Sequence, residues 1–224
     1  MKSLVHLLQI ASPALPIGGY SYSQGLEWMV EAGGIRDAAA AQGWIAAMLD
    51  GVMAHGEAPV VVRLCTFAHA GDWDSFARWH AWFRASRETS ELVAETQQMG
   101  GALAKLLVDL DLADDAIREA MRANSPLTLP GAFALAARAM SIDAHDAAVA
   151  YLWSWLENQV LASLKAVPLG QVAGQKMLLA LGATIPGIVE RAQAMDDDDI
   201  SSFAPGLALA SARHETQYSR LFRS

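Results

Sequence analysis

The chain has 224 residues, enough for one domain with a sizeable core, and 53% of them are hydrophobic whereas 18% are charged. Its net charge of −8 argues against nucleic acid as a ligand, because an acidic surface repels phosphate backbones. The apolar surplus predicts either a large core or a surface that another protein chain covers.

Apolar residues recur at intervals of three and four, which predicts helices almost throughout the chain. Helix starts are indicated by four aspartates whose carboxylates can accept hydrogen bonds from free backbone N–H groups: Asp37, Asp72, Asp114 and Asp146. Pro59 is expected in the first turn of a helix over residues 60–69, where its missing N–H costs little. Helix ends are predicted at the glycine pair 33–34, at Gly71 and at Pro168.

Two long helices are predicted, over residues 89–110 and 146–165. The first carries one continuous stripe of apolar and small residues, Leu92, Thr96, Met99, Leu103, Leu106 and Leu110. The second carries a similar stripe, Val149, Leu152, Trp153, Leu156, Val160 and Leu164. With the shorter segments the count is about ten, so the expected fold is a single-domain, irregular all-α bundle over residues 1–224.

Three segments lack a helical pattern. Residues 11–19 hold two prolines and two glycines, so the N-terminal segment 1–19 is expected to end in an ordered loop. Residues 124–131 predict a second loop. Residues 214–224, HETQYSRLFRS, are expected to form a docking tail that becomes ordered when its large side chains are buried against a partner.

Reactive constellations are scarce, which indicates a protein without catalytic residues. Residues 170–176, GQVAGQK, lack the Gly-Lys-Ser/Thr ending of a phosphate loop, and residues 19–25, GYSYSQG, do not form Gly-x-Ser-x-Gly. No two of the six histidines stand three or four residues apart, so no helix-borne pair of metal ligands is expected. We therefore expect no enzyme, no metal site and no cofactor.

The location expected for this chain is the cytoplasm. Its single cysteine, Cys65, excludes an internal disulfide and suits a reducing compartment. The first ten residues hold one lysine and no small-residue cleavage site, so no secretory signal is expected. No uninterrupted apolar run approaches the ~20 residues that cross a bilayer, so no membrane association is expected.

One acidic run leaves an alternative open. Asp196, Asp197, Asp198 and Asp199 are consecutive, and a solvated loop is the simplest interpretation. A helical lyase or transferase that handles a diphosphate could instead use these carboxylates together with Lys176. Such an enzyme would need a second acidic motif across its cavity, and the sequence has none.

Four stretches are more specific than a generic bundle requires. They are LLQIASPALPIGGYSYSQGLEW (residues 7–28), RETSELVAETQQMGGAL (87–103), LKAVPLGQVAGQ (164–175) and the HETQYSRLFRS tail. Together, and in this order, they resemble the urease accessory protein UreF family over the whole chain. The opening motif and the Ser-Arg-Leu-Phe-x-Ser ending carry the greatest specificity.

The resemblance implies an all-α homodimer without enzymatic activity. Members of this family bind the accessory protein UreD, also called UreH, and recruit the GTPase UreG to the urease apoprotein. The assembly delivers nickel to urease and supports maturation of its active site. The lack of metal ligands fits a scaffold that positions a nickel carrier, and the apolar surplus fits two interfaces.

Partner-contact residues are expected in the family-like stretches and the tail. Lys165 is assigned to the GTPase, with a solvated surface lysine as the alternative, and Arg87 and Glu91 could instead form an internal pair across one helical turn. The full set is Tyr22, Gln24, Arg87, Glu91, Lys165, Gln171, His214, Tyr218, Arg220, Leu221, Phe222 and Arg223.

The adjacent glycines Gly100 and Gly101 stand where relatives often carry a charged residue. They predict either a bend in the long helix or a close approach of another backbone segment.

Overall fold

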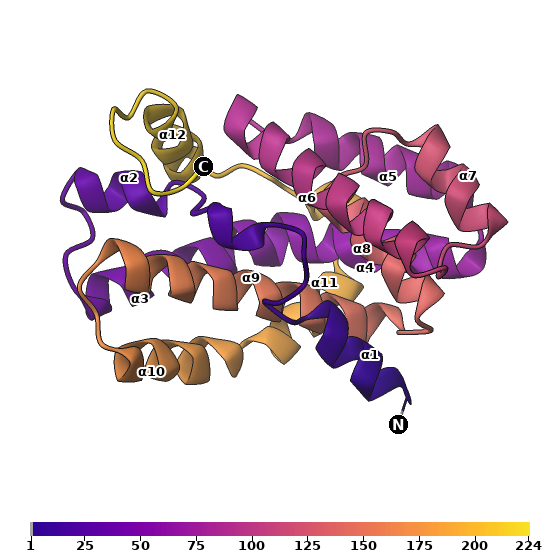
Figure 1. Ribbon diagram of the computed structural model, residues 1–224, viewed down its shortest axis with the longest axis horizontal. Helices are drawn as coiled ribbons and strands as arrows, with labels where there is room; N and C mark the ends of the chain where they lie inside the picture. The colour runs from indigo at the N-terminus through magenta and orange to yellow at the C-terminus, as the bar shows by residue number, and fades with distance from the viewer. Residues whose placement is uncertain (1) are drawn as a thin grey trace.

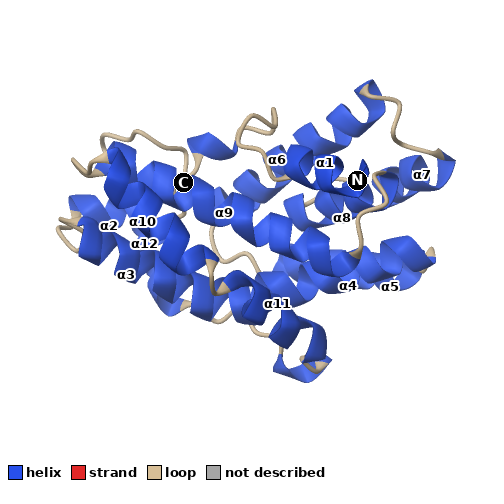
Figure 2. Ribbon diagram, turned by 90° about the horizontal axis from the view of Figure 1, so that it is seen from below, coloured by secondary structure: helices blue, strands red, loops and turns tan. Residues whose placement is uncertain are grey.

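The computed structural model describes residues 2–224, and within them the chain contains helices and no strand (Figure 2). Met1, the first residue of the expected N-terminal segment, lies outside the described residues. The α-helices are α1 (Lys2–Ile10), α2 (Leu26–Glu31), α3 (Ala38–Met48), α4 (Ala58–Ala70), α5 (Trp73–Ala85), α6 (Ser90–Asp109), α7 (Asp115–Ala123), α8 (Leu129–Ala139), α9 (Ala144–Ala166), α10 (Gln171–Gly182), α11 (Ile185–Ala194) and α12 (Pro205–His214). Short helical segments η1 (Gly19–Ser21), η2 (Leu49–Glu57) and η3 (Asp197–Asp199) complete the set. The predicted all-α class is confirmed.

Helices α4, α8 and α9 form the centre of the bundle. Helix α4 packs against α5, α8, α9 and α11, and α6 packs against α8. Figure 1 shows α10 running beside α9, and α12 with the C-terminus lying beside α2, far from the N-terminus. The core contains fully buried aromatic side chains from two helices, Phe76 and Phe83 of α5 and Phe133 of α8. This central packing leaves the C-terminal end of the chain on the outside of the bundle.

One helix is longer than the sequence indicated. Helices α3 and α4 are joined by the π-helical η2 into a continuous helix, Ala38–Ala70. Pro59 lies in the first turn of α4, as expected, but the prediction that the helix begins there is wrong. The helix widens before the proline, since the N–H of Ala58 donates to the carbonyl of Met53, five residues earlier. If the continuous helices Ala38–Ala70 and Gln171–Ala194 are each counted once, ten helices result, as predicted.

Side-chain caps fix most helix starts. Asp37, Asp72 and Asp114 each accept a hydrogen bond from a first-turn N–H, which confirms these predictions. The predicted start at Asp146 is wrong, because Asp143 caps α9 and accepts from the N–H of Asp146. The residue that caps α9 is therefore an aspartate three residues before the predicted one.

The second predicted loop is shorter than expected. Thr128 caps α8 and accepts from the N–H of Gly131, and Pro130 occupies the first turn. Residues 129–131 are therefore helical, because a proline is well suited to a first helical turn.

Two helices are long and apolar enough to cross a bilayer when judged by length and composition alone. They are Ala38–Ala70 and Gln171–Ala194. The most apolar window of the first is 67% buried in the bundle, and that of the second is 33% buried. The first is a core helix of the bundle. The second presents an exposed apolar face that is described with the functional site.

Gly100 allows the closest helix contact in the bundle. A Cβ atom at Gly100 would lie 2.4 Å from the carbonyl oxygen of Leu127 and 2.5 Å from the carbonyl carbon of Thr128. The predicted close approach of a second backbone segment is therefore confirmed at Gly100. At Gly101 a Cβ atom would meet nothing within 4 Å.

This pair of glycines provides a matched test of the packing between α6 and the start of α8. Gly100→Ala should lower the free energy of unfolding by about 3 kcal/mol, because backbone atoms must move to admit the methyl group. Gly101→Ala should leave stability unchanged or raise it by up to about 1 kcal/mol, since alanine favours a helix. Urea unfolding of the two variants measures both effects, and equal stabilities would contradict the packing described.

Candidate functional site

The C-terminal tail, residues 215–224, is folded onto its own chain. Its last residue, Ser224, is completely buried, as is the Phe222 side chain. This differs from the expectation that the segment becomes ordered only against a partner. It also differs at the boundary, because His214 belongs to the end of α12 and not to the tail.

His214 is the centre of the tail's attachment. Its ring is fully buried, with Nδ1 2.7 Å from Glu91 Oε2 and Nε2 3.1 Å from Glu27 Oε2. Each ring nitrogen therefore faces a carboxylate oxygen from a different helix. His214 of α12 is thus the shared hydrogen-bonding partner of Glu27 in α2 and Glu91 in α6.

The same two carboxylates also hold the tail. Glu27 accepts the backbone N–H groups of Leu221 and Phe222, at 2.6 and 3.0 Å. Glu91 accepts Arg220 Nη1 at 2.7 Å. Removing His214 would take the shared partner from both carboxylates and leave Glu91 paired with Arg220 of the tail, so the attachments of the tail and of α12 are coupled.

The end of the tail is fixed by a second set of hydrogen bonds. The carbonyl of Ser224 accepts from both the backbone N–H and the hydroxyl of Ser23, at 2.7 and 2.6 Å. The hydroxyl of Ser224 donates to Glu95 Oε2 at 2.7 Å. The N–H of Arg223 donates to the carbonyl of Ser21, and its guanidinium reaches Gln98. The tail therefore closes against the loop before α2 and against α6.

Gly25 and Glu215 add to this attachment. Gly25 has φ +77°, and a Cβ there would lie 2.8 Å from the Cβ of Ala210, so a side chain would push α12 away from α2. The carboxylate of Glu215 accepts from the backbone N–H of Ser90 and of Glu91 and caps α6. The hydrogen bonds from Ser90 lower the pKa of Glu215 below its usual value.

Several large side chains around the docked tail remain exposed. Tyr218 is fully exposed and Leu221 is 72% exposed, next to the loop that carries Tyr20, which is 65% exposed. Lys165 Nζ lies 5.6 Å from the ring centroids of both Tyr20 and Phe222. We call the surface formed by Tyr20, Lys165, Tyr218 and Leu221 the tail face. It combines aromatic, aliphatic and cationic groups on an ordered backbone.

Tyr22 and Gln24 lie beneath the tail face, not on it. The Tyr22 hydroxyl donates to Gln98 Oε1 at 2.7 Å, and burial raises the pKa of Tyr22 above its usual value. Gln24, with φ +52°, donates to Glu95 and accepts from Trp155. The helix that follows begins only at Leu26. Both residues join the loop to α6 and α9.

Arg87 is also internal. Its guanidinium lies 2.8 Å from Glu57 Oε1 and over the Phe83 ring, and only 7% of its side chain is exposed. Glu57 in addition accepts the Tyr151 hydroxyl at 2.6 Å. The internal pair expected between Arg87 and Glu91 is wrong, because Arg87 precedes α6 and points to η2 while Glu91 faces His214.

A second exposed surface lies on α10 and the adjoining part of α9. Val172 and Leu179 are 70% and 79% exposed, and they lie on one side of α10. Trp153 of α9, predicted as part of the core stripe, is more than a third exposed and lines a hollow with Leu179 and Gly182. We call this surface the α10 face. Gln171, at the start of α10, is exposed near it and has no specific contact among the described residues.

The acidic run does not form a pocket of its own. Asp196 to Asp199 are all exposed, and Arg63 of α4 donates to Asp197 Oδ1 at 2.6 Å. This agrees with a solvated segment and leaves the diphosphate alternative without structural support. Among the described residues, ligand atoms of Asp143, His145 and Asp146 lie within 4.8 Å of one another, but the Asp143 carboxylate is occupied as the cap of α9.

Two further side chains with reactive groups, Cys65 and His80, are buried in the core. Cys65 is completely buried, and desolvation raises the pKa of its thiol to about 12. His80 is buried too, and desolvation lowers its pKa to about 4. Its neutral ring accepts the N–H of Thr128 at 2.9 Å. Both side chains are part of the packed core.

Sequence reasoning found Glu91 of the attachment but missed Glu27 and Glu95, and it missed Glu57 beside Arg87. Glu27, Glu57 and Glu95 are buried although charged residues usually remain exposed, and no periodicity distinguishes them from surface glutamates. For Glu27 a signal existed, since it belongs to the opening stretch that was singled out as specific. Glu95 belongs to the second such stretch.

Glu95 makes the attachment sensitive to pH. Burial raises the pKa of Glu95 from 4.5 to about 7, and hydrogen bonds from Ser224 and Gln24 oppose this shift. Because the folded-state pKa is raised, the stabilising contribution of Glu95 is complete below about pH 4.5 and is lost as the pH rises through 7. The loss is on the order of 3 kcal/mol.

Glu95→Gln should abolish this part of the pH dependence, because the amide stays neutral. Between pH 5 and pH 8 the free energy of unfolding of the variant should rise by about 3 kcal/mol relative to that of the wild type. Denaturant titrations at several pH values measure it. A difference that does not vary with pH would contradict the assignment of Glu95.

The comparisons with known proteins agree with this architecture. The UreF family model matches residues 35–182. The urease accessory protein UreF of Azoarcus sp. (strain BH72) is 53% identical over 99% of this chain and 95% of its own length. The UreF proteins of Methylobacillus flagellatus and Cupriavidus metallidurans are 47% and 50% identical, each over the whole chain and at least 98% of their own length. This chain belongs to the UreF family of urease accessory proteins.

Proposed function

We propose that this chain is a non-enzymatic cytoplasmic scaffold that binds UreD (UreH) through its tail face and recruits the GTPase UreG to apo-urease for GTP-dependent nickel insertion. The observation that carries this proposal is the tail face itself. Its backbone is fixed by hydrogen bonds to Glu27, Ser23 and Ser21, yet Tyr218 and Leu221 point outward and cover nothing of their own chain.

An ordered tail favours the binding of a partner. A segment that becomes ordered on binding subtracts its conformational entropy from the affinity. Here the Glu27 and Ser23 hydrogen bonds have already ordered the tail, so contacts made by Tyr218 and Leu221 contribute to binding without this penalty. Aromatic side chains in such positions are typical of interface hot spots.

The α10 face supports the proposed homodimer. It combines protruding apolar side chains with an adjoining hollow, and a two-fold symmetric contact requires both features on one surface. The apolar window of helix Gln171–Ala194, of which only a third is buried in one chain, would then be buried between two chains.

The two faces can be separated by matched substitutions. Tyr218→Ala combined with Leu221→Ala should weaken UreD capture at least about tenfold, because two exposed interface side chains are lost. Leu179→Ala should leave UreD capture intact and weaken dimerisation. Affinity pull-down together with analytical ultracentrifugation measures both properties. Unchanged UreD capture by the first variant, with its helical content preserved, would remove the tail face as the docking surface.

Lys165 provides the test for the GTPase. Its ammonium group lies between two aromatic rings at the tail face, so it is held in place without an acidic partner among the described residues. Lys165→Ala should weaken recruitment of GTP-loaded UreG by about tenfold and spare UreD capture, whereas Lys176→Ala, an exposed lysine on α10, should change neither. Size-exclusion chromatography of the mixed proteins measures recruitment, and equal elution of UreG with both variants would contradict this role.

A further inference from the structure

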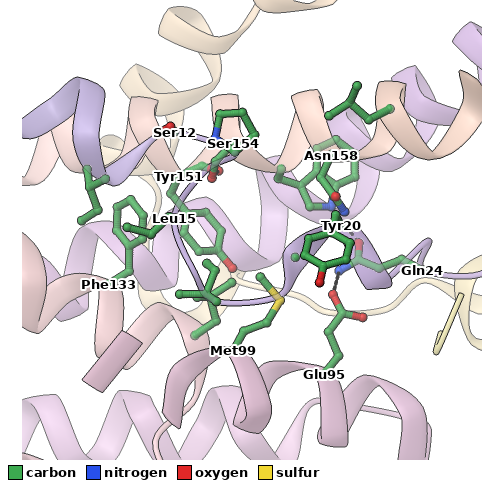
Figure 3. A pocket seen from close by; sticks show the side chains of 17 residues that line it. Ser12, Leu15, Tyr20, Gln24, Glu95, Met99, Phe133, Tyr151, Ser154 and Asn158 are labelled. Carbon is green, nitrogen blue, oxygen red and sulfur yellow. Dashed lines mark hydrogen bonds between the residues drawn. The ribbon is translucent and has the colours of Figure 1, made fainter. Parts of the chain in front are cut away.

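A cavity of about 90 Å³ lies between the proline-containing loop and helices α6, α8 and α9. One end is apolar and is lined by Ile10, Leu15 and Phe133. The other end is polar and contains Gln24, Glu95 and Asn158, with Tyr20 over it (Figure 3). None of these groups belongs to the α10 face, and only Tyr20 is shared with the tail face. The cavity therefore has an amphiphilic lining that the proposed scaffold role does not explain.

The polar end is rich in hydrogen-bond acceptors. Three of the donors around the cavity are directed at acceptors of the chain itself: the Tyr151 hydroxyl at Glu57, the Ser154 hydroxyl at the Tyr151 carbonyl, and the Trp155 indole at Gln24. Glu95 offers about four lone-pair positions and receives two hydrogen bonds, from Gln24 and Ser224. A ligand seated at Glu95 can therefore donate to this carboxylate, whereas its own acceptors would find the hydroxyl of Tyr20.

We propose that this cavity binds a short alkylammonium group, with the ammonium at Glu95 and the alkyl chain against the apolar end. An ammonium has three donors and no acceptor, which matches a carboxylate with lone-pair positions left after its bonds to Gln24 and Ser224. Leu15 and Phe133 offer the alkyl chain apolar surface at the other end of the cavity. A cavity of about 90 Å³ is smaller than the roughly 150 Å³ cavity that holds benzene, which limits the ligand to on the order of five non-hydrogen atoms.

The buried carboxylate also explains why a cation is favoured over a neutral molecule. Desolvation raises the pKa of Glu95 to about 7, so ionising it without a partner is costly. The charge of Glu57 raises this pKa further and that of Arg87 lowers it, and a bound ammonium adds a second counter-charge that shifts Glu95 to its ionised form. A proton competes for the same carboxylate, so binding should weaken as the pH falls below 7.

The test uses the full chain and n-butylammonium chloride, followed by NMR of the backbone amides of residues 12–19 and of the Gln24 side-chain amide. These signals should shift saturably, and 1-butanol and butyrate, which share the chain but not the ammonium, should bind at least about tenfold more weakly. Glu95→Gln should reduce the affinity for butylammonium to a similar extent, whereas Glu88→Gln, the same change at an exposed position, should have no effect.

If Glu95→Gln does not fold, the wild-type chain still tests the proposal. Its affinity for butylammonium should fall by about tenfold between pH 8 and pH 6. Stronger binding of Nα-acetyl-lysine amide than of butylammonium would assign the site to a lysine side chain of another protein, and the reverse order to a free amine. Equal binding of butanol and butylammonium, or no saturable shift, would overturn the proposal. UreD and UreG take no part, so this result is independent of the proposed scaffold role.

Discussion

The placement of the C-terminal tail depends on one buried interaction, the imidazole of His214 between the carboxylates of Glu27 and Glu91. Glu27 is buried and the Glu91 side chain is 11% exposed, and two carboxylates so placed need hydrogen-bond donors around them. His214 places one ring nitrogen against each carboxylate, and Arg220 pairs with Glu91. Since Glu27 also receives two N–H groups of the tail, the attachment of α12 and that of the tail are coupled.

This arrangement connects the core of the bundle with its proposed interfaces. The central helices bury the large apolar side chains, and they leave α2, α6 and α12 to hold the tail at one end. The tail then presents large side chains outward on a fixed backbone. The buried Cys65, His80 and Glu57 are each occupied or shielded within the core.

The sequence predicted the helices well, because their signals are local. The apolar stripe of the 89–110 segment became α6, capped by Thr89, and three of four predicted aspartate caps are present. The failures involve non-local information. Asp143 replaced Asp146 as a cap, and the π-helical widening before Pro59 removed an expected break. Trp153 belongs to a regular stripe, yet its exposure depends on how α10 crosses α9.

The candidate site was predictable by region but not by role. The tail and the opening stretch were identified from their specific residues, and the structure brings them together. Several residues expected to contact partners, among them Arg87 and His214, instead hold the chain together, because their acidic partners are distant in sequence. These charge pairs span 30 residues for Arg87 and Glu57 and 123 for His214 and Glu91, and pairing over such separations leaves no periodic signal.

The central claim is that the tail is an ordered part of the chain before any partner binds. Hydrogen–deuterium exchange at the amides of Ser23, Leu221 and Phe222 in the isolated chain tests it most directly, because each of these groups donates to a buried acceptor. The account predicts strong protection in the absence of UreD. Exchange of all three amides at the rate of an unfolded peptide would contradict it.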